Sequence, residues 1–174
     1  MPRWTYMLML FLAAVPMWPQ SQQDPLTDRE TEQIREYADR PPERIKLYLK
    51  FIEQRTSAIH QLSTDARDRG HGTRLRILIE EFTRLVDELQ DNLDVYSKTH
   101  ADVRKTLKEV IETSGKWPVV LKEAPPDRAY DFSRKTALDA ADSANDEARK
   151  MLAEQEQYFA ELKGKNKKKD AKPE

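Results

Sequence analysis

The sequence predicts an all-α protein, an elongated antiparallel bundle of three to four helices with one long central helix. Of its 174 residues, 38% are hydrophobic, 35% are charged and only four are glycine, a composition typical of long solvated helices. Apolar side chains recur every three or four residues over residues 73–113, which keeps one face of a helix apolar. The same spacing recurs in residues 42–67 and 133–162, so neighbouring helices are available to bury that face.

The N-terminal segment 1–23 has the features of an export signal. A basic start at Arg3 precedes an apolar run over residues 6–15 and a polar stretch over residues 20–23. Residues 4–18 number only 15, fewer than the roughly 20 that a membrane-spanning helix needs. We predict that the segment is removed and that the protein works in the periplasm or is secreted. The segment has no clean Ala-x-Ala cleavage site, so an uncleaved anchor is the alternative.

Local signals mark the first two helices. Thr27 can cap a helix and Glu30 can bond back to the Thr27 amide, which predicts a first helix over residues 28–39. A residue before proline avoids the helical region, so this helix ends at Arg40. Pro42 is well placed to open a second helix that runs to about residue 67. Whether the first helix continues into the second or folds back beside it is left open.

The segment 73–113 predicts the long central helix, with a length of about 60 Å for 41 residues. A glycine-containing turn over residues 65–72 precedes it. Two irregularities interrupt its apolar stripe. From Leu85 to Leu89 to Leu93 the apolar residues are four apart twice in succession, which locally changes the direction in which the apolar face points. The Ser, Thr and His of residues 97–100 lower the helix propensity, and His100 itself occupies a position within the stripe.

The remainder of the chain predicts a folded connection and one more helix. Residues 116–131 contain three prolines together with large apolar side chains, so we expect them to fold back onto the bundle with one short helical turn. The last helix is expected from about Ser133 to Leu162. Its inner face is lined by alanine first and by bulkier side chains later: Leu138, Ala141, Ala144, Ala148, Leu152, Gln155, Phe159 and Leu162.

Residues 164–174 are predicted to form a disordered, lysine-rich tail. From Lys163 onward six lysines stand against two acidic residues, whereas residues 20–162 carry 23 basic and 29 acidic residues. An acidic body argues against nucleic acid as the main partner. The tail either keeps the protein soluble or binds anionic lipid, polysaccharide or nucleic acid. Its candidate interaction residues are Lys165, Lys167, Lys168 and Lys169.

The sequence contains no catalytic or metal-binding motif. A chain without cysteine forms no disulfide and no thiolate zinc site. The three histidines, at positions 60, 71 and 100, lack the Glu-x-x-His spacing of a di-metal bundle, and no phosphate loop or nucleophile elbow is present. We therefore expect no enzymatic activity and no cofactor. The alternative is a carrier that holds a metal or cofactor in the bundle core through His100.

The connection after the long helix offers the best candidate interaction surface. Trp117 and Tyr130 belong to this segment, and loops held by a rigid scaffold often carry binding. The alternative is that Trp117 closes the end of the bundle as a lid. His100 and the tail lysines complete the candidate set.

The residues Leu26-Thr27-Asp28, followed by Gln33-Ile34-Arg35-Glu36, resemble the start of the first helix of Spy/CpxP-type periplasmic proteins. Those proteins carry an LTxxQ motif and bind unfolded client proteins on an α-helical cradle. The match covers fewer than a dozen residues, the glutamine of the motif is absent, and no second copy follows. The resemblance implies a periplasmic chaperone or client binder as an alternative function.

The sequence as a whole predicts an exported, non-enzymatic helical scaffold or protein-interaction protein of the bacterial envelope. Its parts would be the signal peptide 1–23, the bundle domain 24–163 and the tail 164–174. We expect the partner to be a protein or an envelope component, and we expect no integral membrane protein after processing. Because the apolar stripe is wide, a second copy could cover part of it, which leaves a homodimer open.

Overall fold

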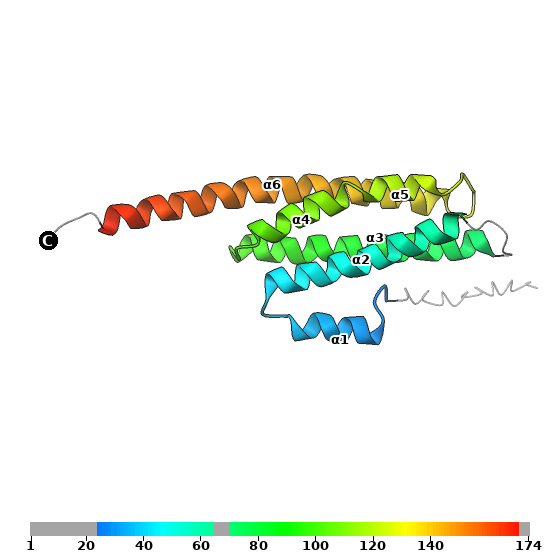
Figure 1. The fold of residues 1–174 in the computed structure, drawn as a ribbon, viewed down its shortest axis with the longest axis horizontal. Coiled ribbons are helices and arrows are strands. Elements are labelled where there is room, and N and C mark those ends of the chain that lie inside the picture. Colours follow the sequence, from blue (N-terminus) through cyan, green and yellow to red (C-terminus); the bar gives the residue numbers. More distant parts are fainter. Residues whose placement is uncertain (1–23, 65–69, 171–174) are drawn as a thin grey trace, which may run out of the picture.

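The computed structural model describes residues 24–64 and 70–170, and these residues form α-helices without any strand. The predicted all-α class is therefore confirmed (Figure 1). The predicted signal peptide 1–23 and residues 65–69 of the predicted turn lie outside the described residues. The helices are α1 (Asp28–Glu36), α2 (Pro41–Thr64), α3 (His71–Lys98), α4 (Arg104–Ser114), α5 (Trp117–Glu123) and α6 (Asp131–Asp170).

Four arms build the bundle: α2, α3, α4 together with α5, and α6. The α2 helix packs on α3, α3 packs on α6, α6 packs on α4 and α5, and these two pack on α2. The α3 arm and the α4–α5 arm therefore lie diagonally across the core. Across this diagonal the rings of Phe82 and Trp117 meet edge to face, with centroids 5.5 Å apart.

Neighbouring arms are not all antiparallel. The α2 and α3 helices run in opposite directions, as expected, but α3 and α6 run in the same direction (Figure 1). Glu80 near the start of α3 accepts a hydrogen bond from Ser133 near the start of α6. Farther along both helices, Gln90 donates to Glu147. The bundle is thus antiparallel only between α2 and α3 and between the α4–α5 arm and α6.

The predicted single helix over residues 73–113 is wrong, because the chain reverses over residues 99–103. Helix α3 ends in a Schellman motif, in which the amide of Ala101 donates to the carbonyl of Tyr96 at 3.1 Å and the amide of His100 to that of Ser97 at 3.1 Å. His100 takes the left-handed position, with a φ of 53°, where glycine is usual. The break falls where residues 97–100 lower the helix propensity.

The first helix folds back along α2 and does not continue it, which answers the question that the sequence left open (Figure 1). The capping box at its start is present as predicted. The Thr27 amide donates to Glu30 Oε2 at 2.8 Å, and the Glu30 amide donates to Thr27 Oγ1 at 3.3 Å. Helix α2 begins at Pro41, one residue earlier than expected.

The connection over residues 116–131 folds onto the bundle as predicted, and its short helical segment is α5. Helix α6 then begins at Asp131 and continues to Asp170, beyond the predicted end at Leu162. Residues 164–170, expected to be part of a disordered tail, are thus helical. Lysine is a good helix former, and its positive charge is favourable near the C-terminal end of a helix. Residues 171–174 lie outside the described residues.

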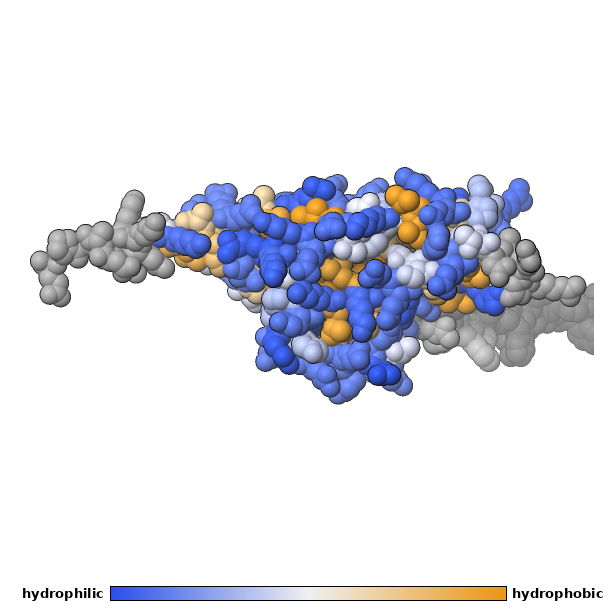
Figure 2. Space-filling model, viewed as in Figure 1, coloured by the Kyte–Doolittle hydropathy of each residue, from blue (hydrophilic) through white to orange (hydrophobic). Residues whose placement is uncertain are grey.

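One apolar core runs between the four arms. The first half of the inner face of α6 is alanine, as predicted, and these small side chains let the neighbouring helices approach closely. The surface seen in Figure 2 is mainly hydrophilic, and its hydrophobic areas are small and separate. None of the described helices is both long and apolar enough to cross a membrane. The fully buried alanines are Ala137, Ala141, Ala144 and Ala148.

Candidate interaction groove

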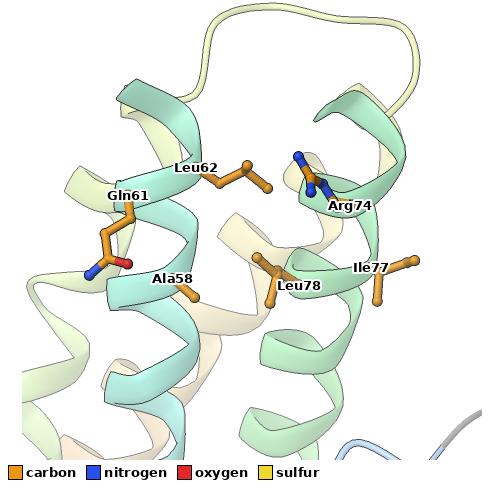
Figure 3. A pocket seen from close by; sticks show the side chains of 6 residues that line it. All are labelled: Ala58, Gln61, Leu62, Arg74, Ile77 and Leu78. Atoms are coloured by element: carbon orange, nitrogen blue, oxygen red, sulfur yellow. The ribbon is translucent and has the colours of Figure 1, made fainter. Parts of the chain in front are cut away.

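An open groove lies between α2 and α3, near the connection that joins these two helices (Figure 3). It has a volume of about 510 Å³. The side chains of Leu62, Arg74 and Leu78 point into the space between the helices. Ile77 on its rim is 37% exposed, while the two leucines are only partly buried against the core. The lining residues are Ala58, Gln61, Leu62, Arg74, Ile77 and Leu78.

The groove lies in line with the α2–α3 seam, the line of contact between α2 and α3, one part of which α1 covers. On α2, the groove residues Ala58, Gln61 and Leu62 follow Arg55 by three, six and seven positions. On α3, the groove residues Leu78, Ile77 and Arg74 precede Glu81 by three, four and seven positions. Residues three, four and seven apart share a helix face. Arg55 pairs with Glu81 across the seam and with Glu30 of α1. Helix α1 therefore closes one part of the seam, and the described residues leave the next part open.

Arg55 connects α1 and the start of the described chain to the bundle. Its side chain is 13% exposed. It donates to both carboxylate oxygens of Glu30, at 2.8 and 2.9 Å, and to Glu81 Oε2 at 3.2 Å. It also donates to the backbone carbonyl of Pro25 at 2.8 Å. Charge-assisted bidentate pairs of this kind are strong and directional, so the chain before α1 is fixed beside the groove.

The electrostatics of this cluster are strongest at Glu30. Burial alone would raise the pKa of its carboxyl, but hydrogen bonds from Arg55 and Thr27 and the charge of Arg55 outweigh burial and lower the pKa from 4.5 to about 2. The carboxylate is thus held ionised by its partners. We interpret the cluster as structural, because its hydrogen bonds cap α1 and join α1 and Pro25 to α2 and α3.

A second polar cluster lies in the α2–α3 seam toward the other end of the bundle. The Tyr48 hydroxyl donates to Glu88 at 3.2 Å, and the Asn92 amide donates to the same hydroxyl at 3.4 Å. Burial raises the pKa of the Glu88 carboxyl, with the Tyr48 hydrogen bond opposing it. This cluster was not predicted from the sequence, because Tyr48 fits the apolar stripe of its helix and Glu88 fits a solvated helix face.

The groove itself was not predicted from the sequence either. Leu62 and Leu78 have the spacing of core residues, and this spacing alone does not distinguish a fully buried position from one at the open end of the interface between two helices. The width of the apolar stripe at Ile77, Leu78 and Ile79 is the one signal that could have indicated it. Ile79 is fully buried, so the apolar surface that the core does not cover belongs to Ile77 and Leu78.

Trp117 and Tyr130, two predicted interaction residues, are both buried, at 2% and 1% exposure. The Trp117 ring packs edge-on against Phe82, and its buried indole N–H has no partner among the described residues. The Tyr130 hydroxyl donates to the carbonyl of Pro125. Their burial fits the lid alternative better than an exposed binding surface.

His100 lies in the turn between α3 and α4 and is exposed. Its ring stacks on Tyr158 of α6, with centroids 4.2 Å apart and 12° between the planes. The structure thus does not place His100 in the bundle core, where a carrier would need it. Within residues 24–64 and 70–170, no group of three or more His, Asp or Glu residues is arranged to hold a metal ion.

The predicted tail residues lie on α6 where it projects beyond the other arms (Figure 1). Lys165 is exposed. The side chains of Lys167, Lys168 and Lys169 lie outside the described part of the structure. The groove and the tail are far apart along the chain, and the predicted candidates do not converge on one site.

The fold and the groove define a class of protein, a four-arm α-helical bundle with one helix folded onto it and an open apolar groove beside that helix. Comparison with known proteins adds no family to this description. No protein-family model, no curated protein and no solved structure matches the chain.

Proposed function

We propose that the protein is an exported, non-enzymatic scaffold that binds an apolar segment of another protein of the bacterial envelope in the α2–α3 groove. Export is supported by the basic start, the apolar run and the polar end of residues 1–23. The lack of a catalytic motif in the sequence supports a binding role. Among the described residues that line the groove, Arg74 alone is ionisable, so this part of the lining offers no acid–base pair.

The observation that carries this proposal is the open apolar end of the α2–α3 seam. Ile77 is exposed, and Leu62 and Leu78 face a space of about 510 Å³. A groove between two helices suits one helix or one extended segment that inserts apolar anchors. Burying a leucine or isoleucine fully contributes about 1.5–3 kcal/mol, so two or three anchors contribute roughly 3–9 kcal/mol toward the cost of association.

The test is photo-crosslinking from the groove in cells of the native host. A photoreactive benzoylphenylalanine replaces Ile77 in one variant and Val95 in the control. Val95 is also on α3 and is 54% exposed, but it lies outside the groove. We expect one or two discrete adducts from position 77 and none from position 95. Equal adducts from both positions, or none from either, would contradict the proposed function.

The same experiment addresses the chaperone alternative. A client binder contacts many unfolded proteins, so position 77 would give a broad ladder of adducts and no discrete band. In that case the purified protein should also suppress aggregation of a denatured test protein. The Ala58→Glu variant, which places a charge in the groove, should abolish this suppression, whereas Ser57→Glu on a neighbouring face should not.

A further inference from the structure

The chain enters the bundle directly beside the groove. The carbonyl of Pro25 is held by Arg55 at 2.8 Å, and the groove begins at Ala58, three residues farther along α2. At a rise of about 1.5 Å per residue, the groove extends from roughly 5 to 10 Å beyond this anchor. Pro25 itself is buried, so the entry point is fixed by packing as well as by the hydrogen bond.

Helix α1 also begins toward the end of α2 that holds the groove. Helix α1 runs opposite to α2, so its N-terminal end points toward the C-terminal end of α2 (Figure 1). The groove lies at that end.

The composition of the preceding residues matches the groove. Residues 19–23 are Pro-Gln-Ser-Gln-Gln, a polar stretch, and before them stand Trp18, Met17 and the apolar run over residues 6–15. Trp18 lies six positions before Asp24, and an extended chain spans at most about 3.3–3.6 Å per residue, so Trp18 can reach either end of the groove.

We propose that in the unprocessed chain the apolar part of segment 1–23, with Trp18 foremost, occupies the α2–α3 groove. Removal of the segment then uncovers the groove for the partner. This inference rests on the proposed function, because uncovering the groove has an effect only if another protein binds there. An intramolecular occupant has a high effective concentration, so modest affinity suffices to keep the groove closed.

The absence of cysteine makes a direct test available. Pro19→Cys and Gln61→Cys are introduced together into the full 174-residue chain, which is produced without export and oxidised when dilute. Gln61 lies on the groove rim, and Trp18 and the apolar lining stay intact. We expect a disulfide within one chain, seen as a faster-migrating monomer and confirmed by peptide mass spectrometry.

Two matched variants separate docking from chance contact by a free chain end. Ala58→Glu places a charge in the groove, and Ser57→Glu places the same charge on a neighbouring, exposed position of α2. Docking predicts that disulfide formation slows about tenfold or more with Ala58→Glu and is unchanged with Ser57→Glu. Equal rates in the two variants would overturn the inference. Disulfides that form only between chains would also overturn it and would assign the groove to a second copy.

The outcome for this inference is independent of the outcome for the proposed function. The disulfide assay contains no partner, and the photo-crosslinking assay detects the partner of the processed protein. Partner adducts without the disulfide would overturn only the docking of segment 1–23. The disulfide without any adduct would overturn only the partner-binding role.

Discussion

Arg55 and Glu30 hold α1 on the bundle through two parallel hydrogen bonds of 2.8 and 2.9 Å. Both side chains are nearly buried, at 13% and 11% exposure, so the pair is desolvated and depends on good geometry. Removing one partner of such a pair leaves a buried, unpaired charge, which is more costly than losing an exposed ion pair. Single substitutions here should therefore change both stability and its pH dependence.

The first prediction concerns the pH dependence of folding. The pKa of Glu30 falls from 4.5 to about 2 on folding. A lowered carboxyl pKa contributes stability that is present above pH 4.5 and is lost as the pH falls toward 2. Glu30→Gln should lower the free energy of unfolding by about 2–3 kcal/mol at pH 7 and flatten its decline between pH 4.5 and 2. Urea denaturation at several pH values measures both effects.

Glu32→Gln is the matched control. Glu32 also lies on α1, but its pair with Arg35 is exposed at 66% and 73%, and exposed pairs contribute little. The control should keep the pH profile of the unchanged protein. If Glu30→Gln and Glu32→Gln gave the same profile, the Arg55–Glu30 pair would not be formed in solution.

The second prediction concerns the backbone of His100. Its φ of 53° is strained for a β-branched residue and free for glycine. His100→Val should therefore be less stable than His100→Gly by about 1–3 kcal/mol, although both lose the stacking on Tyr158. Thermal unfolding followed by circular dichroism compares the two. Equal stability would show that residue 100 does not adopt the left-handed conformation.

At the scale of elements, the turn between α3 and α4 is held from outside by α6. Gln155, which is buried, donates to the carbonyl of Ala101 at 2.8 Å and accepts from the amide of Val103 at 3.2 Å. Both backbone groups lie in the segment that reverses the chain, where neither helix supplies a partner. One side chain thus satisfies two backbone groups that would otherwise be buried unpaired.

The third prediction follows from this contact. Gln155→Leu keeps much of the volume but leaves both backbone groups without partners, so it should lower the free energy of unfolding by about 2–3 kcal/mol. Gln157→Leu is the control, because Gln157 is exposed and bonds only to Glu161 on its own helix. Its effect should stay within about 0.5 kcal/mol. Comparable losses in the two variants would mean that Gln155 does not fix the turn.

The same elements show what the sequence could and could not predict. The start of α1 was predictable because a capping box is a local signal of four residues. The reversal after α3 was not, because Tyr96, Val103 and Leu107 are all buried and keep the spacing of one continuous stripe. Periodicity reports which face is apolar and carries no information about chain direction. The groove was hidden for a related reason, since Leu62 and Leu78 have core spacing but lie at an open end.

At the scale of the molecule, the reversal decides the architecture. A single helix over residues 73–113 would make a three-arm bundle, whereas the hairpin of α3 and α4 makes four arms. Helix α4 then lies between α2 and α6, and Lys46 of α2 approaches Glu109 of α4 at 3.8 Å. On the other side, Lys108 approaches Glu156 of α6 at 3.6 Å.

The last prediction tests this architecture by zero-length cross-linking of lysine to carboxylate. Glu88 bonds to Tyr48, which lies two residues after Lys46 on α2. In one continuous helix, Glu109 would lie 21 residues beyond Glu88 and hence about 30 Å from Lys46. The folded-back α4 therefore predicts a Lys46–Glu109 peptide adduct, which Glu109→Gln should remove. The adduct between Lys116 and Glu112, whose atoms are 2.9 Å apart, is the control, because neighbours four residues apart react in either arrangement. The control adduct without the Lys46–Glu109 adduct would contradict the four-arm bundle.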